Sequence, residues 1–370
     1  MKILMVGKYF YPVVGGVEIH IQNLARELIK KGHTVEVFAS DRGFSGNSLP
    51  LEGRIEGIGI KRFSNLFSLL AAIRNCDHDI IHFHLFRKVY VDIAIIAGKL
   101  TGKPIVFTPH CVYPAQSCAM YFAKIIYDNS FGRSSLALVD KIIALTDNDR
   151  NDIIKIGASP EKIEIVPNSI RFENFEMLAP DKLFRDKYGI DKFLLYVGRV
   201  DWNKGLEYVI QAMPEIKSFG LKFVIVGEDV GYRSKLDKLI REIGVSEEVI
   251  FTGKISIDML LSAYAACAMF VLPSFYEGLP TVVLEAMAYK KPVIATRTGG
   301  TKYVVRHGDN GFLIEYGDPD NTYKVVQEAL GSDLKAIGEN ARADVEANYT
   351  WEKSAGKIER IYEELLNREH

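Results

Sequence analysis

Short apolar runs alternate with amphipathic stretches along the first half of the chain. The runs that we predict as strands are Lys2–Val6, Thr34–Ala39, Ile58–Phe63, Asp79–Phe83, Pro104–Thr108, Lys141–Leu145 and Lys162–Val166. Helical patterns lie between most of them. The clearest covers Val17–Lys30, where Ile21 and Leu28 recur on one side and Gly32 ends the helix. Strands that alternate with helices predict a parallel sheet covered by helices on both faces.

The second half repeats this pattern. Strands are predicted at Phe193–Val197, Lys222–Val226, Val249–Thr252, Ala268–Leu272, Pro292–Ala295 and Phe312–Ile314. Helices are predicted at Leu206–Ile216, Arg233–Ile243, Asp258–Cys267, Thr281–Ala288, Thr301–Val305 and Asp320–Leu330. The charged segment from Ser169 to about Asp191 lacks a strong strand pattern, so the boundary is placed there. We therefore expect domains at residues 1–170 and 190–350, followed by a tail, 351–370, with an amphipathic helix over Trp351–Leu366.

Length and composition fit two hydrophobic cores. The chain has 370 residues, of which 48% are hydrophobic and 25% are charged. A net charge of −1 argues against a nucleic-acid partner. The first half is slightly basic and the second slightly acidic. This suits contact between the N-terminal domain and an anionic membrane surface, but ordinary scatter explains it equally well.

The cysteines and the N-terminal run indicate an intracellular protein. Cys76, Cys111, Cys118 and Cys267 fit a reduced protein better than a disulfide scaffold. The apolar run at the N-terminus reads as a strand and not a signal peptide, because it is short and Lys8 follows it. We expect a cytoplasmic protein, with peripheral contact at the inner membrane surface as an option.

One segment of the second half joins a predicted strand end to a helix start. Pro280 suits the first helical position, because the N–H that it lacks would be unpaired there. The N–H groups of Thr281 and Val282 then point out of the helix end, where they can bind an anion. Glu277 lies in the loop, and Glu285 lies one turn into the helix. A phosphate held by N–H groups, with carboxylates for hydroxyls, describes a nucleotide-sugar site.

Four motifs, in order, cover nearly the whole chain. The spacing Glu277-x7-Glu285 in a Glu-Gly-Leu-Pro-Thr setting resembles the donor motif of the retaining glycosyltransferases of family 4. The run Gly198–Gly205 resembles the second motif of that family, and Gly15–Glu18 resembles the third. Val166–Ser169 resembles its hinge, although the family pattern has Gly where this chain has Ser169.

The resemblance implies an α/β fold with the GT-B architecture. In this architecture two doubly wound, Rossmann-like domains face a central cleft, and the last helix crosses back to the first domain. Ligands of such sheets bind at the carboxyl ends of the strands. Neither half carries Gly-x-Gly-x-x-Gly after a strand, which argues against a nicotinamide-binding fold.

Arg199 and Lys204 follow a predicted strand, beside Gly198. Arg can grip a diphosphate with two hydrogen bonds, and Lys can act as a point charge. In glycosyl transfer the diphosphate leaves, so cations here would stabilise the charge that grows as the bond breaks. The alternative is a solvated loop with two surface cations.

Glu285 is the candidate for the ribose hydroxyls, because a carboxylate accepts two hydrogen bonds from a vicinal diol. Glu277, with the backbone at Gly278 and Leu279, is the candidate for the hydroxyls of the donor sugar. Each carboxylate has a structural alternative, since acids near a helix start complement the helix dipole.

Two further loops are candidates for backbone contacts with the donor. Gly15 and Gly16 lie between the first strand and its helix, and the resemblance implies that this loop meets the donor phosphates; a plain tight turn is the alternative. In the family, backbone at the segment Gly253, Lys254 and Ile255 reads the base. Backbone contacts leave little trace in side chains, so these residues do not identify the base.

His110 follows a predicted strand and matches the active-site histidine of the family. The resemblance implies a hydrogen bond to a donor hydroxyl, and the alternative is a structural histidine at a strand end. His82 and His84 share one side of a strand, and with His110 they would make a conceivable metal site. We expect no metal, because no carboxylate pattern supports one and the family needs none.

An apolar and basic stretch lies in the first half. It comprises Phe83, Leu85, Phe86, Arg87, Lys88, Val89 and Tyr90, and Tyr113 and Tyr121 follow near His110. These residues would suit the mouth of a lipid-facing acceptor site. Core packing with one solvated charge pair is the alternative.

The expected activity is metal-independent transfer of a sugar from a nucleotide diphosphate, with retention of configuration. A UDP- or GDP-linked sugar is the expected co-substrate, no other cofactor is expected, and the acceptor is a glycan, a lipid-linked molecule or a small molecule. Two alternatives remain open. One is a GT-B epimerase of nucleotide sugars, and the other is a catalytically silent partner of a membrane glycosyltransferase.

Overall fold

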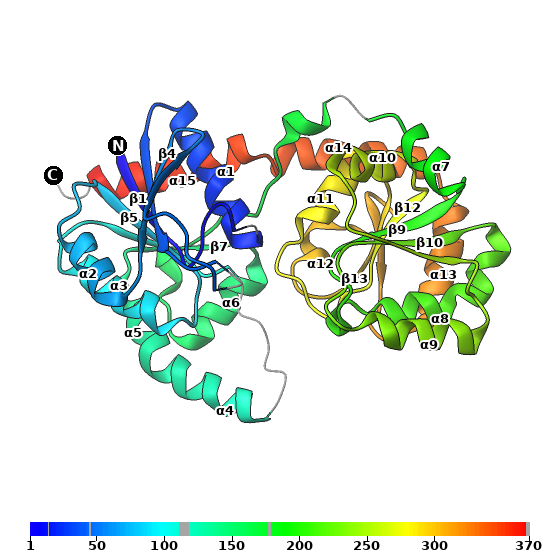
Figure 1. The fold of residues 1–370 in the computed structure, drawn as a ribbon, viewed down its shortest axis with the longest axis horizontal. Coiled ribbons are helices and arrows are strands. Elements are labelled where there is room, and N and C mark those ends of the chain that lie inside the picture. The colour runs from blue at the N-terminus through cyan, green and yellow to red at the C-terminus, as the bar shows by residue number, and fades with distance from the viewer. Residues whose placement is uncertain (14, 44–45, 111–117, 177–178, 368–370) are drawn as a thin grey trace. The chain divides into compact units, whose positions relative to one another are not determined.

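The computed structural model describes residues 1–13, 15–43, 46–110, 118–176 and 179–367. The chain forms two compact units (Figure 1). The first unit contains residues 1–168 and 351–370, and the second contains residues 169–350. The segment Ser169–Asp191, in which sequence analysis places the boundary, lies in the second unit, because Phe175 and Phe184 are buried in its core.

Eight described strands form the sheet of the first unit, in the order β3-β4-β2-β1-β5-β6-β7-β8. Their bounds are β1 (Lys2–Val6), β2 (Thr34–Ser40), β3 (Glu52–Ile55), β4 (Ile58–Phe63), β5 (Ile80–His84), β6 (Ile105–Thr108), β7 (Lys141–Ala144) and β8 (Ile163–Ile165). The neighbours pair in parallel except β3 and β4, which are antiparallel. The strand order reverses direction between β1 and β5. Ligands of open α/β sheets bind beside such a point, at the carboxyl ends of the strands.

Helices cover the sheet of the first unit. They are α1 (Gly16–Lys30), α2 (Leu66–Arg74), α3 (Val89–Lys99), α4 (Cys118–Tyr127), η1 (Asp128–Gly132), α5 (Arg133–Leu138), α6 (Asp147–Ile156), η2 (Pro160–Lys162) and α15 (Trp351–Leu366). The last of these, α15, lies beside α1 (red and blue in Figure 1). Its residues Trp351, Ile358 and Tyr362 are buried in the same core as Ile21 and Leu24 of α1. The C-terminal helix is therefore part of the first unit.

The sheet of the second unit has the strand order β11-β10-β9-β12-β13-β14 and is parallel throughout. Its strands are β9 (Phe193–Val197), β10 (Lys222–Val226), β11 (Val249–Gly253), β12 (Met269–Leu272), β13 (Val293–Thr296) and β14 (Gly311–Ile314). This is the doubly wound order 3-2-1-4-5-6, in which the direction of winding reverses between the first and fourth strands. Here those strands are β9 and β12.

The second unit buries one continuous apolar core between its sheet and helices. The helices are η3 (Phe172–Phe175), α7 (Lys182–Tyr188), η4 (Trp202–Lys204), α8 (Leu206–Ile216), η5 (Lys217–Phe219), α9 (Arg233–Ile243), α10 (Ile257–Ala266), α11 (Thr281–Ala288), α12 (Thr301–Val304), α13 (Pro319–Leu330) and α14 (Leu334–Asn348). In the described part of the chain, no helix has both the length and the apolarity needed to cross a membrane.

The predicted strands and α/β class agree with the structure. The elements that escaped prediction include helix α7, the edge strand β3 and helix α14. The edge strand β3 has the exposed, charged sequence Glu-Gly-Arg-Ile, which carries no apolar run. Helix α14 has charges of both signs and few large apolar residues, and the side chain of Asp333 caps its N-terminus. Helix α11 begins at Thr281, so Pro280 precedes the helix instead of opening it.

Candidate active site

Two loops of the second unit lie at the point where the strand order reverses. One follows β9 and runs to Gly205, and the other follows β12 and leads into α11. The N–H of Phe275 in the second loop donates to the carbonyl of Asn203 in the first, at 2.9 Å. A Cβ on Gly205 would lie 2.2 Å from the carbonyl oxygen of Pro273, and the φ of Gly205 is +63°. Only glycine therefore lets the two loops pack this closely.

The packing of the loops brings Lys204 and Glu277 together. Lys204 Nζ lies 2.6 Å from Glu277 Oε1, and the exposed fractions of the two side chains are 16% and 13%. The backbone of Glu277 is held separately, since the N–H of Gly300 donates to its carbonyl at 2.8 Å. The sequence motifs predict that Lys204 contacts the diphosphate and Glu277 the sugar, and the structure also pairs the two side chains with each other.

Arg199 is exposed, and it lies in the loop after β9 that also carries Lys204. The Tyr196 hydroxyl donates to the Arg199 carbonyl at 2.9 Å and so fixes the start of the loop. Burial raises the pKa of Tyr196 well above its usual value, the negative charge of Glu277 raises it further, and Arg199 opposes both. In the described part of the chain the Arg199 guanidinium has no hydrogen bond or ion pair, so it can turn toward an anion.

Glu285 lies on α11, one turn after its start. The Tyr264 hydroxyl donates to Glu285 Oε2 at 2.8 Å. Burial raises the pKa of Glu285, and the hydrogen bond from Tyr264 partly offsets this. At the start of the helix, Val283 N–H donates to the Pro280 carbonyl at 3.2 Å. The amides of Thr281 and Val282 precede this bond and lie where a helix end can bind an anion.

Glycines end the three neighbouring strands β9, β10 and β11. Gly198 N–H donates to the Val226 carbonyl at 2.9 Å, and Gly227 N–H donates to the Gly253 carbonyl at 3.0 Å. A Cβ on Gly227 would lie 1.9 Å from the Gly198 carbonyl oxygen. Gly198, Gly227 and Gly253 form a glycine row at the adjacent strand ends. It exposes main-chain atoms without side chains, which leaves room for a flat ligand. Gly198 and Gly253 are among the predicted site residues. Gly227 is not, although it directly follows the apolar strand β10.

The other two residues of the predicted base-reading segment are positioned differently. Lys254 Nζ lies 2.6 Å from Glu228 Oε2, and both side chains are mostly exposed. Ile255 is half-buried against the core. A surface ion pair of this kind contributes little to stability. Lys254 is therefore a weaker candidate than the backbone around Gly253.

Two polar groups in the loops also escaped sequence analysis. The Oγ of Ser274 and the Oδ1 of Asn203 are buried without a hydrogen-bond partner in the described structure. The Ser274 carbonyl, in contrast, accepts from Thr296 Oγ1 at 2.6 Å and from Thr298 Oγ1 at 3.3 Å. Ser and Asn are common in ordinary loops, so their types alone gave no signal.

In the first unit, Gly15 and Gly16 lie at the N-terminus of α1. Gly15 is the N-cap with extended backbone, and Gly16 is the first helical residue. A Cβ on Gly16 would have no atom within 4 Å. Neither residue has the positive φ that a tight turn would require. The described structure of this unit thus gives no steric reason for glycine at position 16, and a close approach by another molecule would give one.

A cluster of histidines lies at the carboxyl ends of β5 and β6 in the same unit. His20, His82 and His84 are buried, and His110 is half-buried. His84 Nδ1 and His110 Nε2 are 2.9 Å apart. His110 has a φ of +60°, a left-handed conformation that is uncommon outside glycine. His20 comes from α1, and its ring lies 4.6 Å from that of His110 between centroids. His82 is bound differently: its ring nitrogens contact the hydroxyls of Tyr362 at 2.6 Å and Thr108 at 2.7 Å.

Burial keeps these imidazoles neutral near pH 7. It lowers the pKa of His20 to about 4, while a hydrogen bond to Asn168 opposes the shift. Burial also lowers the pKa values of His84 and His110 well below the usual range, and the charges of neighbouring histidines add to the effect. A neutral His110 can donate one hydrogen bond and accept another.

The apolar and basic stretch of the first unit is largely structural. Phe83 and Phe86 are buried in its core, and Arg87 forms a two-point ion pair with Asp128, at 3.0 and 2.8 Å. Core packing is therefore the better account of this stretch. Tyr113 and Cys111 lie outside the described residues. Apolar surface gathers instead on α4, whose exposed residues are Met120, Tyr121, Phe122, Ile125 and Ile126.

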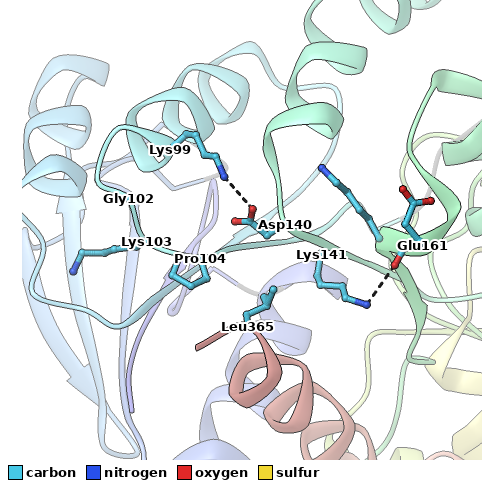
Figure 2. A pocket seen from close by; sticks show the side chains of 9 residues that line it. Lys99, Gly102, Lys103, Pro104, Asp140, Lys141, Glu161 and Leu365 are labelled. Carbon is cyan, nitrogen blue, oxygen red and sulfur yellow. Dashed lines mark hydrogen bonds and ion pairs between the residues drawn. The ribbon is translucent and has the colours of Figure 1, made fainter. Parts of the chain in front are cut away.

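A separate pocket of about 410 Å³ opens at the amino ends of β6 and β7, away from the histidines (Figure 2). Figure 2 shows Lys99 directed at Asp140, with 2.9 Å between Nζ and Oδ1. Lys141 and Lys162 donate to Glu164 and to the carbonyl of Val139, each at 2.8 Å. Because these ammonium groups already have partners, the pocket reads as a structural feature and not as the active site.

Comparison with known proteins agrees with this geometry. The model of the family "Glycosyl transferases group 1" matches residues 181–344, and that of "Glycosyltransferase Family 4" matches residues 14–174. An uncharacterized glycosyltransferase of Methanocaldococcus jannaschii is 28% identical over 100% of both chains. The gpi3 subunit of the phosphatidylinositol N-acetylglucosaminyltransferase of Schizosaccharomyces pombe is 25% identical, over 98% of this chain and 80% of its own. The structure of HepE from Anabaena in complex with UDP matches with a TM-score of 0.82 and 19% identity, over 98% of this chain and 100% of that one.

Proposed function

Because this chain belongs to the family 4 glycosyltransferases and is an enzyme of the GT-B type, we propose that it transfers a sugar with retention of configuration and without a metal. The donor is a nucleotide-diphosphate sugar, and UDP or GDP is its nucleotide. The observation that carries this proposal is the Lys204–Glu277 pair at the point where the strand order reverses, with Arg199 in the same loop as Lys204.

Arg199, Lys204 and the start of α11 would bind the diphosphate. As the glycosidic bond breaks, negative charge grows on the leaving phosphate, and cations fixed nearby lower the energy of that state. Arg199 has the freedom to form two hydrogen bonds with phosphate oxygens. Lys204 would remain near Glu277, where it can contact a phosphate and keep the carboxylate in place. The amides of Thr281 and Val282 would bind the remaining phosphate oxygens.

Glu285 and the glycine row would hold the nucleoside. A carboxylate that already accepts from Tyr264 at Oε2 can accept a ribose hydroxyl at its other oxygen. The backbone at Gly198, Gly227 and Gly253 leaves room for a flat base. The UDP bound by HepE favours a uridine nucleotide here as the first choice to test.

Glu277 and His110 would position the donor sugar. Glu277 Oε1 is engaged with Lys204, which suits a carboxylate that accepts sugar hydroxyls better than one that attacks carbon. Gly278 and Leu279 would add backbone contacts. His110, neutral at pH 7, would exchange a hydrogen bond with another sugar hydroxyl, and the amides around Gly15 and Gly16 are further partners for anionic substrate groups.

In this mechanism no separate base is needed. The acceptor hydroxyl attacks the anomeric carbon on the side from which the phosphate leaves, so the configuration is retained. The bond from that carbon to the phosphate oxygen breaks as the new bond to the acceptor oxygen forms. The departing phosphate oxygen takes the hydroxyl proton, which balances the reaction.

A glycan or lipid-linked acceptor fits the first unit. Helix α4 exposes a cluster of large apolar side chains, with Ile126 70% and Phe122 64% exposed. Lys124 lies among them and can meet anionic headgroups. The relative from Schizosaccharomyces pombe is named for a phosphatidylinositol acceptor. We therefore place α4 at the inner surface of a membrane, as a peripheral contact of a cytoplasmic enzyme.

The test combines nucleotide binding with product analysis. We expect UDP or GDP to raise the melting temperature, because ligand at a hundredfold above Kd adds about 2.7 kcal/mol. The shift should disappear in Arg199→Ala/Lys204→Ala. With the matching nucleotide sugar and an acceptor panel, the product should keep the anomeric configuration of the donor by NMR. A modified nucleotide sugar made from donor alone would instead identify an epimerase, and binding without any transfer would identify a silent partner.

A further inference from the structure

The histidine cluster of the first unit contains buried nitrogens that the structure leaves unused. His20 and His84 are 3% and 0% exposed. The Nε2 atom of each is buried and has no hydrogen-bond partner among the described residues. Leaving a buried polar atom unpaired is unfavourable. His82, which uses both of its nitrogens, shows how a purely structural histidine is accommodated at the same place.

The tautomers follow from the partners. His20 Nδ1 lies 3.3 Å from Asn168 Oδ1, and an amide oxygen only accepts, so Nδ1 carries the proton and Nε2 carries a lone pair. When His84 donates through Nδ1 to His110 Nε2, the Nε2 of His84 carries a lone pair as well. The lone pair of His110 then lies on its Nε2, where a cation would replace the His84 N–H as its partner. One ring nitrogen from each of His20, His84 and His110 lies within 4.8 Å of the others.

We propose that His20, His84 and His110 form a binding site for a divalent transition-metal cation such as Zn²⁺ or Co²⁺. Imidazole is a preferred ligand of these ions, and three histidines with an open fourth position are a stable set. The hydrogen bond from His20 to Asn168 is the kind of outer contact that orients a ligating histidine. The set contains no carboxylate, so the cation would keep its charge and take water or a substrate anion as its fourth ligand.

Occupancy would inhibit the enzyme. This consequence rests on the proposed function, in which His110 exchanges a hydrogen bond with the donor sugar. A cation that holds a nitrogen of His110 withdraws that nitrogen from the sugar. Binding would also require small movements of the three imidazole rings toward the cation, because ligand nitrogens around zinc lie about 2.0–2.1 Å from the metal. The site would thus act as a metal-sensitive brake on a reaction that itself needs no metal.

The test measures binding first, on the full chain, after removal of metal by a chelator. Equilibrium dialysis against Zn²⁺, with metal content by mass spectrometry, should give one ion per chain. Co²⁺ should give the visible absorption of a tetrahedral complex. His20→Asn and His84→Asn keep an amide donor near the position of Nδ1 but remove Nε2, and each should weaken binding about tenfold or more. His307→Ala, a change to a histidine in the second unit, should leave binding unaltered.

Melting temperature and circular dichroism check that each variant is folded. Wild-type binding weaker than about 1 mM, or equal binding by wild type and both folded Asn variants, would overturn the site and leave water or a substrate hydroxyl as the partner of the free nitrogens. In a second arm, Zn²⁺ should lower transfer by the wild type but not by His20→Asn. Binding without inhibition would overturn the braking role alone. An inactive wild type would count against the proposed function, while the dialysis result would still decide the metal site.

Discussion

Lys204 and Glu277 are 73 positions apart in the sequence, and their charged groups lie 2.6 Å from each other in the second unit. Both side chains are mostly buried, so each depends on the other for compensation of its charge. The candidate site therefore contains one paired cation, Lys204, and one exposed cation, Arg199. Within these three residues the charges of Lys204 and Glu277 cancel, so Arg199 supplies the uncompensated positive charge that a diphosphate would meet.

This relationship predicts opposite effects for its two members. Lys204→Met should lower affinity for UDP or GDP about 10–100-fold, because it removes a cation and leaves the Glu277 carboxylate facing the phosphates. Glu277→Gln should keep or raise that affinity, because it frees Lys204, but should lower kcat for sugar transfer. Calorimetric titration and steady-state kinetics measure the two effects.

Lys290→Met is the matched control, since Lys290 pairs with Glu339 at 2.9 Å on the surface of the same unit. It should change neither affinity nor kcat. If Glu277→Gln weakened nucleotide binding as much as Lys204→Met, the pair would act as a structural unit, and the separate roles would be wrong.

The ribose contact predicts a dependence on the sugar of the nucleotide. Glu285→Gln should lower affinity for UDP about tenfold or more, because a hydrogen bond to a charged group is lost. Affinity for dideoxyuridine diphosphate, which has no ribose hydroxyls, should be the same in variant and wild type. Tyr264→Phe should have a smaller effect on UDP, because it leaves the carboxylate intact. Equal losses for both nucleotides would show that Glu285 acts on the fold and not on the ribose.

Gly299 predicts a steric effect on the site. Its φ is +53°, and a Cβ there would lie 1.9 Å from the carbonyl oxygen of Glu277. Gly299→Ala should displace Glu277 and lower both the melting temperature and nucleotide-sugar transfer. Gly220→Ala is the control, because Gly220 has a φ of +69° but no atom within 4 Å of an added Cβ. It should cost only about 1–2 kcal/mol of stability and leave transfer unchanged. Similar losses of transfer in both variants would show that the clash with the Glu277 carbonyl is not the cause.

The exposed surface of α4 predicts binding to lipid. The double variant Phe122→Asp/Ile126→Asp should reduce sedimentation with vesicles that contain anionic lipid. It replaces two apolar side chains that would insert into the bilayer with negative charges. High salt should weaken wild-type binding only in part, since the apolar contribution is not screened. Phe67→Asp changes a side chain that is 83% exposed on α2 and should have no effect. No sedimentation of the wild type at either salt concentration would end the membrane proposal.

Two cysteines should differ in reactivity. Burial raises the pKa of Cys76, but hydrogen bonds with His78 and the charge of Lys103 outweigh this and lower it overall. Burial raises the pKa of Cys267 to about 12. Near pH 7, iodoacetamide should therefore label Cys76 about tenfold faster or more, as peptide mass spectrometry would show. His78→Asn should slow the labelling of Cys76. Equal labelling rates at both cysteines in the wild type would contradict the expected difference between their pKa values.

The sequence predicted the features that leave a local pattern. The strands that flank the site are apolar runs, and Gly198, Glu277 and Glu285 sit in a recognisable order after them. The Lys204–Glu277 contact could not be read, because it depends on how two loops pack at neighbouring strand ends. Ser274 and Asn203 were missed for the same reason, since only burial distinguishes them from other loop residues. His20 was missed because a histidine within an amphipathic helix gives no sign of which rings it will meet.

The return of α15 to the first unit has a consequence for synthesis. Trp351, Ile358 and Tyr362 complete the core beside α1, and the Tyr362 hydroxyl contacts His82 at 2.6 Å. On a ribosome, this helix emerges only after the whole second unit. The second unit is continuous in sequence and can fold as soon as residue 350 is free, whereas the first unit, although begun earlier, stays unfinished until α15 has been made as well. The order of maturation along this chain is thus the reverse of the order of translation.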